Sequence, residues 1–294
     1  MQTISILLIL KLTVHLSMGF VIIFYKGMIP SLDKVQYASC SEKTVFQCGA
    51  LSSEGSKNEG ENLVDEEMMR RLRQEAQERL ERLGALMEQG VRVLDPTTVY
   101  VDEGVRVGAG TLLLPGTILR GRTVIGKDCE IGPNSMITDC VVGDGVVINS
   151  SQLNESVIDD EAKVGPFAYI RPHCHVCRGV KVGDFVELKN STVGKNTKIS
   201  HLTYVGDSDV GEGVNFGCGT VTVNYDGATK FRTTIGDGAF IGCNTNLVAP
   251  VKVGEGAYTA AGSTITEDVP PESLAIARSA QVVKKGWVDK RKKR

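Results

Sequence analysis

Residues 101–137 read VDEGVRVGAGTLLLPGTILRGRTVIGKDCEIGPNSMI, and this stretch decides the fold. An aliphatic side chain returns at every sixth position, namely at Val101, Val107, Leu113, Leu119, Ile125, Ile131 and Ile137. The residue four places further on is small or β-branched, as at Val105, Thr111 and Thr117. A glycine often follows the aliphatic residue, as in VGAG and IGKD. A β protein without repeats would not hold this register for long, so the pattern indicates a repeat architecture.

The same six-residue period continues to residue 265, with a few slips of phase. Its later aliphatic positions are Val142, Ile148, Ile158, Val164, Ile170, Val176, Val182, Leu188, Val193, Ile199, Val205, Val210, Phe216, Ile235, Ile241, Leu247, Val253 and Ile265, with Thr259 in the same series. A hexapeptide repeat is typical of a parallel β-helix, in which stacked coils enclose one continuous apolar core. We therefore predict an all-β, left-handed parallel β-helix over residues 97–270. Three hexads would make each triangular coil of eighteen residues.

A different pattern precedes the repeats, at residues 63–90. Apolar residues recur there at steps of three and four, which indicates one amphipathic α-helix packed on a neighbour. This stripe comprises Met69, Leu72, Ala76, Leu80, Leu83 and Leu86. Asp65 and Glu67 suit the start of such a helix, and Gly90 suits its end.

The first 62 residues form a third region, an apolar segment followed by a flexible linker. Residues 4–25 are apolar except for Lys11 and His15. This segment is long enough for a membrane anchor. No positive region precedes them and no clear cleavage site follows, so a secretory signal fits poorly. Residues 26–61 lack any period. We therefore favour a third interpretation, in which this region is not native to the fold, as in a truncated or mis-started reading frame.

The net charge and the number of cysteines argue against two classes of protein, nucleic-acid-binding proteins and disulfide scaffolds. The net charge of −2 gives no global field for nucleic acid. Eight cysteines spread over 294 residues are too sparse for a disulfide scaffold and are interpreted as reduced thiols. Residues 271–294 form a C-terminal arm ending in KKGWVDKRKKR. This basic end is interpreted as a solvated tail, although its charge would also suit coenzyme phosphates or anionic lipid.

The repeat register also predicts which side chains face outward. His201 lies two places after the inward Ile199 and should point out. Arg171 and Lys189 are eighteen residues apart, so they should stack on one outer edge. Two stacked cations repel unless an anion lies between them, which suggests phosphate recognition. Cys129 and Cys174, by contrast, occupy the small inward position and should be core thiols.

The period is interrupted once, between Val221 and Ile235. Residues 222–234 are therefore expected to leave the coil as a projecting loop, and such loops on rigid scaffolds often carry function. This one contains Asn224, Tyr225, Asp226 and Lys230.

Three motifs in this part of the chain resemble a known family. They are VNFGCGT (214–220), VNYDGATKFRTTIGDGAFIGCNTNLVAPVKVGEGAYTAAGSTIT (223–266) and LAIARSAQVVKKGW (274–287). They resemble the acetyltransferase half of the bacterial bifunctional glucosamine-1-phosphate N-acetyltransferase/N-acetylglucosamine-1-phosphate uridyltransferases. The resemblance covers about 65–290 and excludes 1–60. The Gly-rich phosphate loop of the uridyltransferase half does not occur in this sequence. The resemblance therefore implies acetyl transfer alone.

The resemblance also implies roles for individual residues. His201 matches the catalytic base, Arg171 and Lys189 match cations that bind the sugar phosphate, and Tyr204 and Asn215 match amino-sugar contacts. Positions that match acetyl-CoA contacts are Cys218, Asn224, Tyr225, Lys230, Cys243, Ala261 and Arg278. Many family members have Ala and Ser where this chain has Cys218 and Cys243.

The implied reaction moves the acetyl group of acetyl-CoA to the amine of glucosamine-1-phosphate. Its product, N-acetylglucosamine-1-phosphate, leads to UDP-GlcNAc, peptidoglycan and lipopolysaccharide. The amine must lose a proton, and a histidine suits that step near neutral pH. In the family three chains pack side by side with sites between them, so we expect a homotrimer. Acetyl-CoA places the reaction in the cytoplasm, and no metal is required for it.

Three rival interpretations fit parts of the sequence less well. HCHVC (173–177) suggests a metal cluster, but Cys174 is expected to point inward and neighbouring side chains alternate faces, so no metal site is expected. A β-helix carbonic anhydrase would bind zinc through three histidines, but His201 lies 28 residues from His173, far from a multiple of eighteen. The third is a β-helix scaffold without catalytic activity or a membrane-tethered fragment, which an activity assay of His201→Ala would distinguish.

Overall fold

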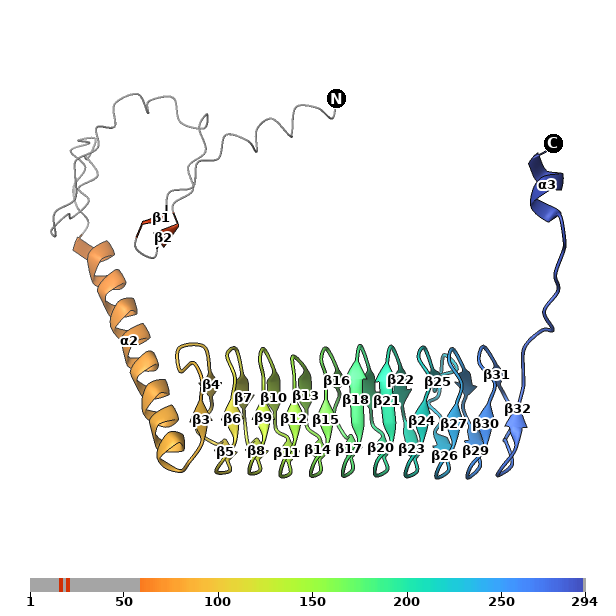
Figure 1. Cartoon of the computed structure of the whole chain (residues 1–294). Coiled ribbons are helices and arrows are strands. Elements are labelled where there is room, and N and C mark those ends of the chain that lie inside the picture. Colours follow the sequence, from red (N-terminus) through yellow and green to blue (C-terminus); the bar gives the residue numbers. More distant parts are fainter. Residues whose placement is uncertain (1–15, 18–19, 22–58, 293–294) are drawn as a thin grey trace. The chain divides into compact units, whose positions relative to one another are not determined.

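The computed structural model describes residues 16–17, 20–21 and 59–292 (Figure 1). Residues 59–294 form one compact unit, separate from residues 1–58. Within 1–58 the described residues are two short antiparallel strands, β1 (Leu16–Ser17) and β2 (Phe20–Val21). The rest of the apolar segment 4–25 and the linker up to residue 58 lie outside the described residues. Within the described part, no helix combines the length and the apolar character that a membrane crossing requires.

Residues 92–275 form a left-handed parallel β-helix, as the hexapeptide period predicts (Figure 1). The chain visits three parallel sheets of eleven, ten and nine strands in turn, so three successive strands complete one coil. The eleven-stranded sheet comprises β3 (Arg92–Val93), β6 (Leu112–Leu113), β9 (Glu130–Ile131), β12 (Val147–Ile148), β15 (Lys163–Val164), β18 (Lys181–Asp184), β21 (Lys198–His201), β24 (Asn215–Phe216), β27 (Phe240–Ile241), β30 (Tyr258–Thr259) and β32 (Leu274–Ala275). The ten-stranded sheet comprises β4 (Tyr100–Val101), β7 (Ile118–Arg120), β10 (Met136–Thr138), β13 (Gln152–Asn154), β16 (Tyr169–Ile170), β19 (Glu187–Lys189), β22 (Tyr204–Gly206), β25 (Val221–Val223), β28 (Asn246–Val248) and β31 (Thr264–Ile265). The nine-stranded sheet comprises β5 (Arg106–Val107), β8 (Val124–Ile125), β11 (Val141–Val142), β14 (Val157–Ile158), β17 (His175–Val176), β20 (Thr192–Val193), β23 (Ser208–Val210), β26 (Thr233–Ile235) and β29 (Val251–Val253).

The interior of the coil stack is filled by the residues that the period selects. Every position of the aliphatic series is buried, and the small residues between them, such as Thr117, are buried as well. Buried hydroxyls bond to main-chain carbonyls, as Thr117 Oγ1 does to Leu114 O at 2.7 Å. The prediction that Cys129 and Cys174 are core thiols is confirmed.

The number of residues in a coil is not always eighteen. Tyr169 pairs with Glu187 eighteen residues later, whereas Glu187 pairs with Tyr204 seventeen residues later. Met136 pairs with Gln152 after only sixteen. The slips of phase in the sequence are therefore shorter corners, and coils that contain one fall below the eighteen residues of three full hexads.

The glycine after the aliphatic residue is needed because successive coils approach closely at one corner. A Cβ placed on Gly126 would lie 2.4 Å from the carbonyl oxygen of Gly143 in the next coil. The φ of Gly126 is not positive, so close approach of the next coil's main chain is the reason for glycine at this position.

Helix α2 (Glu59–Glu88) begins at Glu59 rather than at residue 63. It contacts the first coil at β3 and β4, where Leu83 and Leu86 are buried. The remainder of the predicted stripe behaves differently, because Met69, Leu72 and Leu80 are exposed. The predicted packing of this helix on a neighbour is therefore seen at its C-terminal end, through Leu83 and Leu86. The apolar stripe shows which face of α2 can pack. Only the part of that face that lies against the first coil, at β3 and β4, is buried within the chain.

The end of α2 and the last elements of the chain complete the unit. Gly90 follows the helix with a φ of 92°, which only glycine adopts freely, in agreement with the predicted helix stop. Arg79 lies over the Tyr100 ring at 4.4 Å.

At the other end, the arm after β32 carries a six-residue helix, α3 (Trp287–Lys292).

Replacing Ile170 by alanine is expected to lower the free energy of unfolding by about 2–5 kcal/mol. Ile170 is 0% exposed, so the change leaves a cavity between coils. Urea unfolding followed by circular dichroism measures the effect, with Leu202→Ala as the control. Leu202 is 57% exposed, and its loss should cost no more than about 0.5 kcal/mol. Equal losses for both variants would contradict the inward and outward assignment.

Candidate functional site

His201 stands at the corner between the eleven-stranded and ten-stranded sheets, where β21 ends. Its side chain is 56% exposed, as predicted from the register. Asp184 lies directly opposite it in the previous coil, and His201 Nδ1 is 2.6 Å from Asp184 Oδ1. The hydrogen bond with His201 is the main cause that lowers the pKa of Asp184. Asp184 was missed in the sequence, although it lies one coil before His201.

The same corner repeats in the next coils and carries three of the seven predicted acetyl-CoA residues. We call it the His201 corner, and it comprises Asp184, His201, Cys218, Cys243 and Ala261. Its register follows from three main-chain hydrogen bonds, Gly219 N to Leu202 O, Asn244 N to Cys218 O and Gly262 N to Cys243 O, at 3.1, 2.8 and 2.8 Å. Arg278 extends this row, since a Cβ on Gly262 would lie 3.8 Å from Arg278 Cδ. Coil stacking thus aligns His201 with four of the predicted acetyl-CoA residues.

A second cluster lies at the corner between the ten-stranded and nine-stranded sheets. Arg171 and Lys189 lie there one coil apart, as the eighteen-residue spacing predicts. Each has a carboxylate partner that the sequence did not single out. Arg171 Nη1 is 2.9 Å from Glu187 Oε1, and Lys189 Nζ is 3.0 Å from Asp207 Oδ2. The hydrogen bond with Glu187 raises the pKa of Arg171.

Asp207 is the centre of this second cluster, which we call the Asp207 corner (Arg171, Lys189, Asn190, Asp207, Asn224). The side chain is buried and accepts hydrogen bonds from three donors. They are Asn190 Nδ2 at 2.6 Å, Lys189 Nζ at 3.0 Å and Asn224 Nδ2. Burial acts to raise the pKa of Asp207, but these donors outweigh it and hold that pKa below its usual value. The carboxylate therefore ties two coils and the start of the projecting loop together.

The projecting loop is shorter than predicted. Strand β25 continues to Val223 and β26 resumes at Thr233, so residues 224–232 leave the coil instead of 222–234. The loop closes through Phe231 N, which donates to Asn224 O at 2.9 Å, and a bridge pairs Tyr225 with Lys230. Lys189 lies beside Lys230 and lowers the pKa of the Lys230 amine.

The loop is also held at its C-terminal end and by its own acidic residue. Asp226 accepts from Ala228 N and Thr229 N at 2.8 and 2.7 Å, which forms a tight turn at the loop tip. Arg232 forms an ion pair with Asp209 and donates to Asn190 O at 3.2 Å. The loop conformation is therefore fixed by contacts to the scaffold at both ends.

Tyr204 and Asn215 lie on different sheets. Tyr204 is on β22 of the ten-stranded sheet, and its hydroxyl is 3.4 Å from Asn224 Nδ2. Asn215 is on β24 of the eleven-stranded sheet, opposite Lys198 and Phe240. Within a single chain, Tyr204 therefore lies beside the Asp207 corner, whereas Asn215 lies on the outer face of the eleven-stranded sheet.

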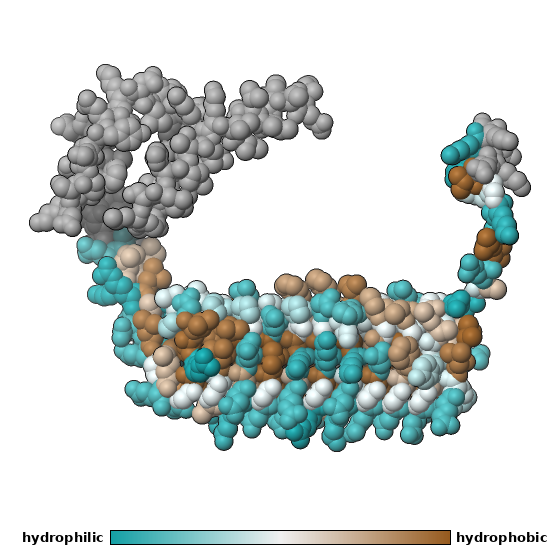
Figure 2. Space-filling model, viewed as in Figure 1, coloured by the Kyte–Doolittle hydropathy of each residue, from teal (hydrophilic) through white to brown (hydrophobic). Residues whose placement is uncertain are grey.

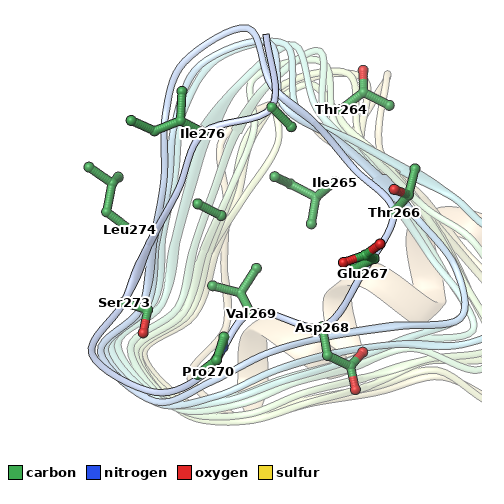
Figure 3. A pocket seen from close by; sticks show the side chains of 12 residues that line it. Thr264, Ile265, Thr266, Glu267, Asp268, Val269, Pro270, Ser273, Leu274 and Ile276 are labelled. Carbon is green, nitrogen blue, oxygen red and sulfur yellow. The ribbon is translucent and has the colours of Figure 1, made fainter.

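A hollow of about 390 Å³ lies at the end of the coil stack and contains none of the predicted site residues (Figure 3). Figure 3 shows Ile265, Val269 and Ile276 around the open end of the last coil. This hollow is the uncovered end of the apolar core. The predicted site residues lie instead on the outer surface of the coils.

The amino-acid sequence of this chain is similar to a family of bacterial transferases and to parts of larger bacterial proteins. Residues 104–139 and 232–267 match the family described as "Bacterial transferase hexapeptide (six repeats)". The chain is 56% identical over 205 residues to the bifunctional protein GlmU of Clostridium acetobutylicum, covering 70% of this chain and 45% of that protein. It is 53% identical over 204 residues to GlmU of Brevibacillus brevis, covering 69% and 44%. The chain thus spans less than half the length of the curated relatives it matches.

A solved structure of UDP-N-acetylglucosamine acyltransferase from Francisella novicida is also similar. It shares 18% identity, covers 62% of this chain and 66% of that chain, and gives a TM-score of 0.41.

Proposed function

We propose, from the homology of this chain to part of the bifunctional GlmU proteins, that it transfers acetyl from acetyl-CoA to the amine of glucosamine-1-phosphate. The product would be N-acetylglucosamine-1-phosphate, a precursor of UDP-GlcNAc and, through it, of peptidoglycan and lipopolysaccharide. The observation that carries this proposal is the His201–Asp184 pair in line with the predicted coenzyme row. Uridyl transfer is not proposed for this chain.

His201 would act as the general base. Ionised Asp184 only accepts hydrogen bonds, so in the neutral imidazole of His201 the proton would lie on Nδ1 and Nε2 would keep its lone pair. Nε2 can then take a proton from the amine as its nitrogen attacks the thioester carbonyl. The tetrahedral intermediate collapses with cleavage of the C–S bond, and the same proton passes to the departing thiolate of coenzyme A. Main-chain N–H groups or asparagine side chains would stabilise the oxyanion.

Arg171 and Lys189 would bind the phosphate of the sugar, and Lys230, which matches an acetyl-CoA contact, would add a third cation beside them. The pKa of Lys230 is lowered mainly by its contact with Lys189, although Asp207 nearby acts in the opposite direction. A phosphate dianion would relieve that repulsion and accept hydrogen bonds from all three cations. Tyr204 lies on the same sheet and would contact the amino sugar.

The donor would lie along the His201 corner. Cys218, Cys243 and Ala261 offer one continuous row, and Arg278 at its end suits a coenzyme phosphate. Asn224 and Tyr225 on the loop would complete the acetyl-CoA contacts. No metal enters this reaction, and the need for acetyl-CoA places it in the cytoplasm.

Assembly into a homotrimer with sites between subunits would explain why Asn215 lies on another face. Figure 2 shows an apolar band along the coil stack on the face in view, bordered by hydrophilic side chains. Such a band suits the side-by-side packing of further copies. A second chain could then supply Asn215 to the amino-sugar site of the first.

The proposal is tested by following free coenzyme A with a thiol reagent. Purified protein and acetyl-CoA are mixed with glucosamine-1-phosphate, glucosamine-6-phosphate or unphosphorylated glucosamine. We expect rapid release with the first acceptor and rates at least about tenfold lower with the other two, because only the first places phosphate and amine at the right separation. Equal rates with all three acceptors, or no release above the protein-free rate, would overturn the proposal.

Asp184→Asn is expected to lower kcat about tenfold and leave KM nearly unchanged. Asparagine can still accept the hydrogen bond, but the stronger bond to a charged acceptor is lost, which is worth about 1.4 kcal/mol or one factor of ten. The matched control is Asp159→Asn, since Asp159 forms a similar pair with His175 on another sheet. Steady-state kinetics that gave both variants the same rate would remove Asp184 as a positioning residue.

A further inference from the structure

A second His–Asp pair lies on the outer face of the nine-stranded sheet. His175 Nε2 on β17 is 3.0 Å from Asp159 Oδ2, which follows β14 in the previous coil. Cys177 follows His175 by two residues and therefore shares its face of the strand. The proposed acetyl transfer uses none of these three residues.

The strand register explains why the three side chains converge. Val157 pairs with His175 and Ile158 pairs with Val176. The next step of this parallel ladder places Asp159 opposite Cys177, and the main chain continues in step, since Asp159 N donates to Val176 O at 2.8 Å. Asp159 therefore faces Cys177 directly and His175 diagonally.

The distances suit a small metal site. The possible ligand atoms of Asp159, His175 and Cys177 all lie within 4.8 Å of one another. Bonds from zinc to oxygen, nitrogen and sulfur ligands are about 2.0–2.3 Å long, so two tetrahedral ligands lie roughly 3.3–3.7 Å apart. The Asp159–His175 separation is already close to that range, and small side-chain rotations would bring the thiol into it.

The charged side chains near Asp159, His175 and Cys177 form ion pairs with one another and not with these three residues. Lys195 forms an ion pair with Glu212 at 3.1 Å, and Arg178 forms one with Glu161 at 2.5 Å. All three side chains of the group are at least partly exposed, so a metal ion and a solvent ligand can reach them.

We propose that Asp159, His175 and Cys177 bind a divalent transition-metal ion of the zinc class. One carboxylate oxygen, one imidazole nitrogen and one thiolate sulfur match the ligand set of Zn²⁺, and water takes the fourth position. The thiol and imidazole bind in their deprotonated forms, so binding releases protons to solvent. The ligands come from two successive coils, so the ion links one coil to the next.

This inference differs from the expectation drawn from HCHVC alone. Cys174 points inward, as the sequence predicted, and cannot be a ligand. Asp159 replaces it from sixteen residues before His175, and no local motif in the sequence connects the two positions. The site lies on the nine-stranded sheet, whereas the His201 corner joins the other two sheets. It is therefore separate from the proposed acetyl transfer, which needs no metal.

The test uses the full chain, stripped with a chelator and titrated under reducing conditions. Zn²⁺ binding is measured by calorimetry, and Co²⁺ binding by its thiolate charge-transfer band and tetrahedral absorption. We expect Cys177→Ser to abolish the charge-transfer band and to weaken Zn²⁺ binding at least about 100-fold, because loss of outer ligands alone costs 10–100-fold. Asp159→Asn and His175→Gln should each weaken Zn²⁺ binding by at least about tenfold.

Two matched variants serve as controls, Cys243→Ser for an exposed thiol elsewhere and His173→Asn for the neighbouring histidine. Both should bind both ions as the unmodified chain does. Cys40, Cys48 and His15 lie outside the described residues, so only binding that Cys177→Ser removes counts in favour. A charge-transfer band that persists in Cys177→Ser, or no band in the unmodified chain, would overturn the proposal. Circular dichroism checks that each variant is folded.

Discussion

His201→Ala is expected to lower kcat for acetyl transfer to glucosamine-1-phosphate by about 10²–10⁴-fold, with little change in KM. The imidazole is the group we propose to remove the amine proton, and alanine offers no acceptor at that position. Initial rates of coenzyme A release over a range of pH measure the effect.

The control for this experiment is His173→Asn. His173 is exposed and has a φ of 66°, a conformation that asparagine tolerates well. It lies outside both corners, so the variant should keep the rate of the unmodified chain. If His201→Ala kept that rate as well, the base assignment would be wrong, and a scaffold without this chemistry would become the better interpretation.

Asp207→Ala is expected to lower the free energy of unfolding by about 3–5 kcal/mol. The side chain of Lys189 is only 18% exposed, so its amine would be left without its carboxylate partner in a partly desolvated place. The amides of Asn190 and Asn224 would lose the same acceptor. Because Asn224 begins the projecting loop, the change should also raise the KM for acetyl-CoA. Urea unfolding and steady-state kinetics measure the two effects.

Asp209→Ala is the matched control, since Asp209 pairs with Arg232 at the surface. Exposed ion pairs contribute little, so this variant should lose less than about 1 kcal/mol. If both variants lost the same amount, Asp207 would be no more than a surface contact.

The effect of Asp207 should depend on pH in a defined direction. The folded-state pKa of Asp207 lies below its usual value, so its stabilisation is complete above the unfolded pKa of about 3.9. The stabilisation is lost as the pH falls through the lower folded-state pKa. The difference in unfolding free energy between the unmodified chain and Asp207→Asn should therefore be constant near neutral pH and shrink in acid.

The loop and the helix show where prediction from sequence became less accurate. The break in the period located the loop, but its ends were wrong because Val223 and Thr233 still pair with neighbouring coils. The helix was found from its apolar stripe, yet only Leu83 and Leu86 are buried. In both cases the local pattern is correct, and the contacts that end an element come from other parts of the chain.

The sequence by itself determined the β-helix, its inward residues and the outward position of His201. A six-residue period fixes these because the direction of each side chain depends only on its place within a hexad. Only the tertiary structure decided which side chains meet. Asp184 with His201, Asp207 with Lys189, and Asp159 with Cys177 are each separated by about one coil, and coil length varies from sixteen residues to twenty-five in the coil that carries the projecting loop. Partners across coils therefore depend on the actual stacking register, which spacing in the sequence does not fix.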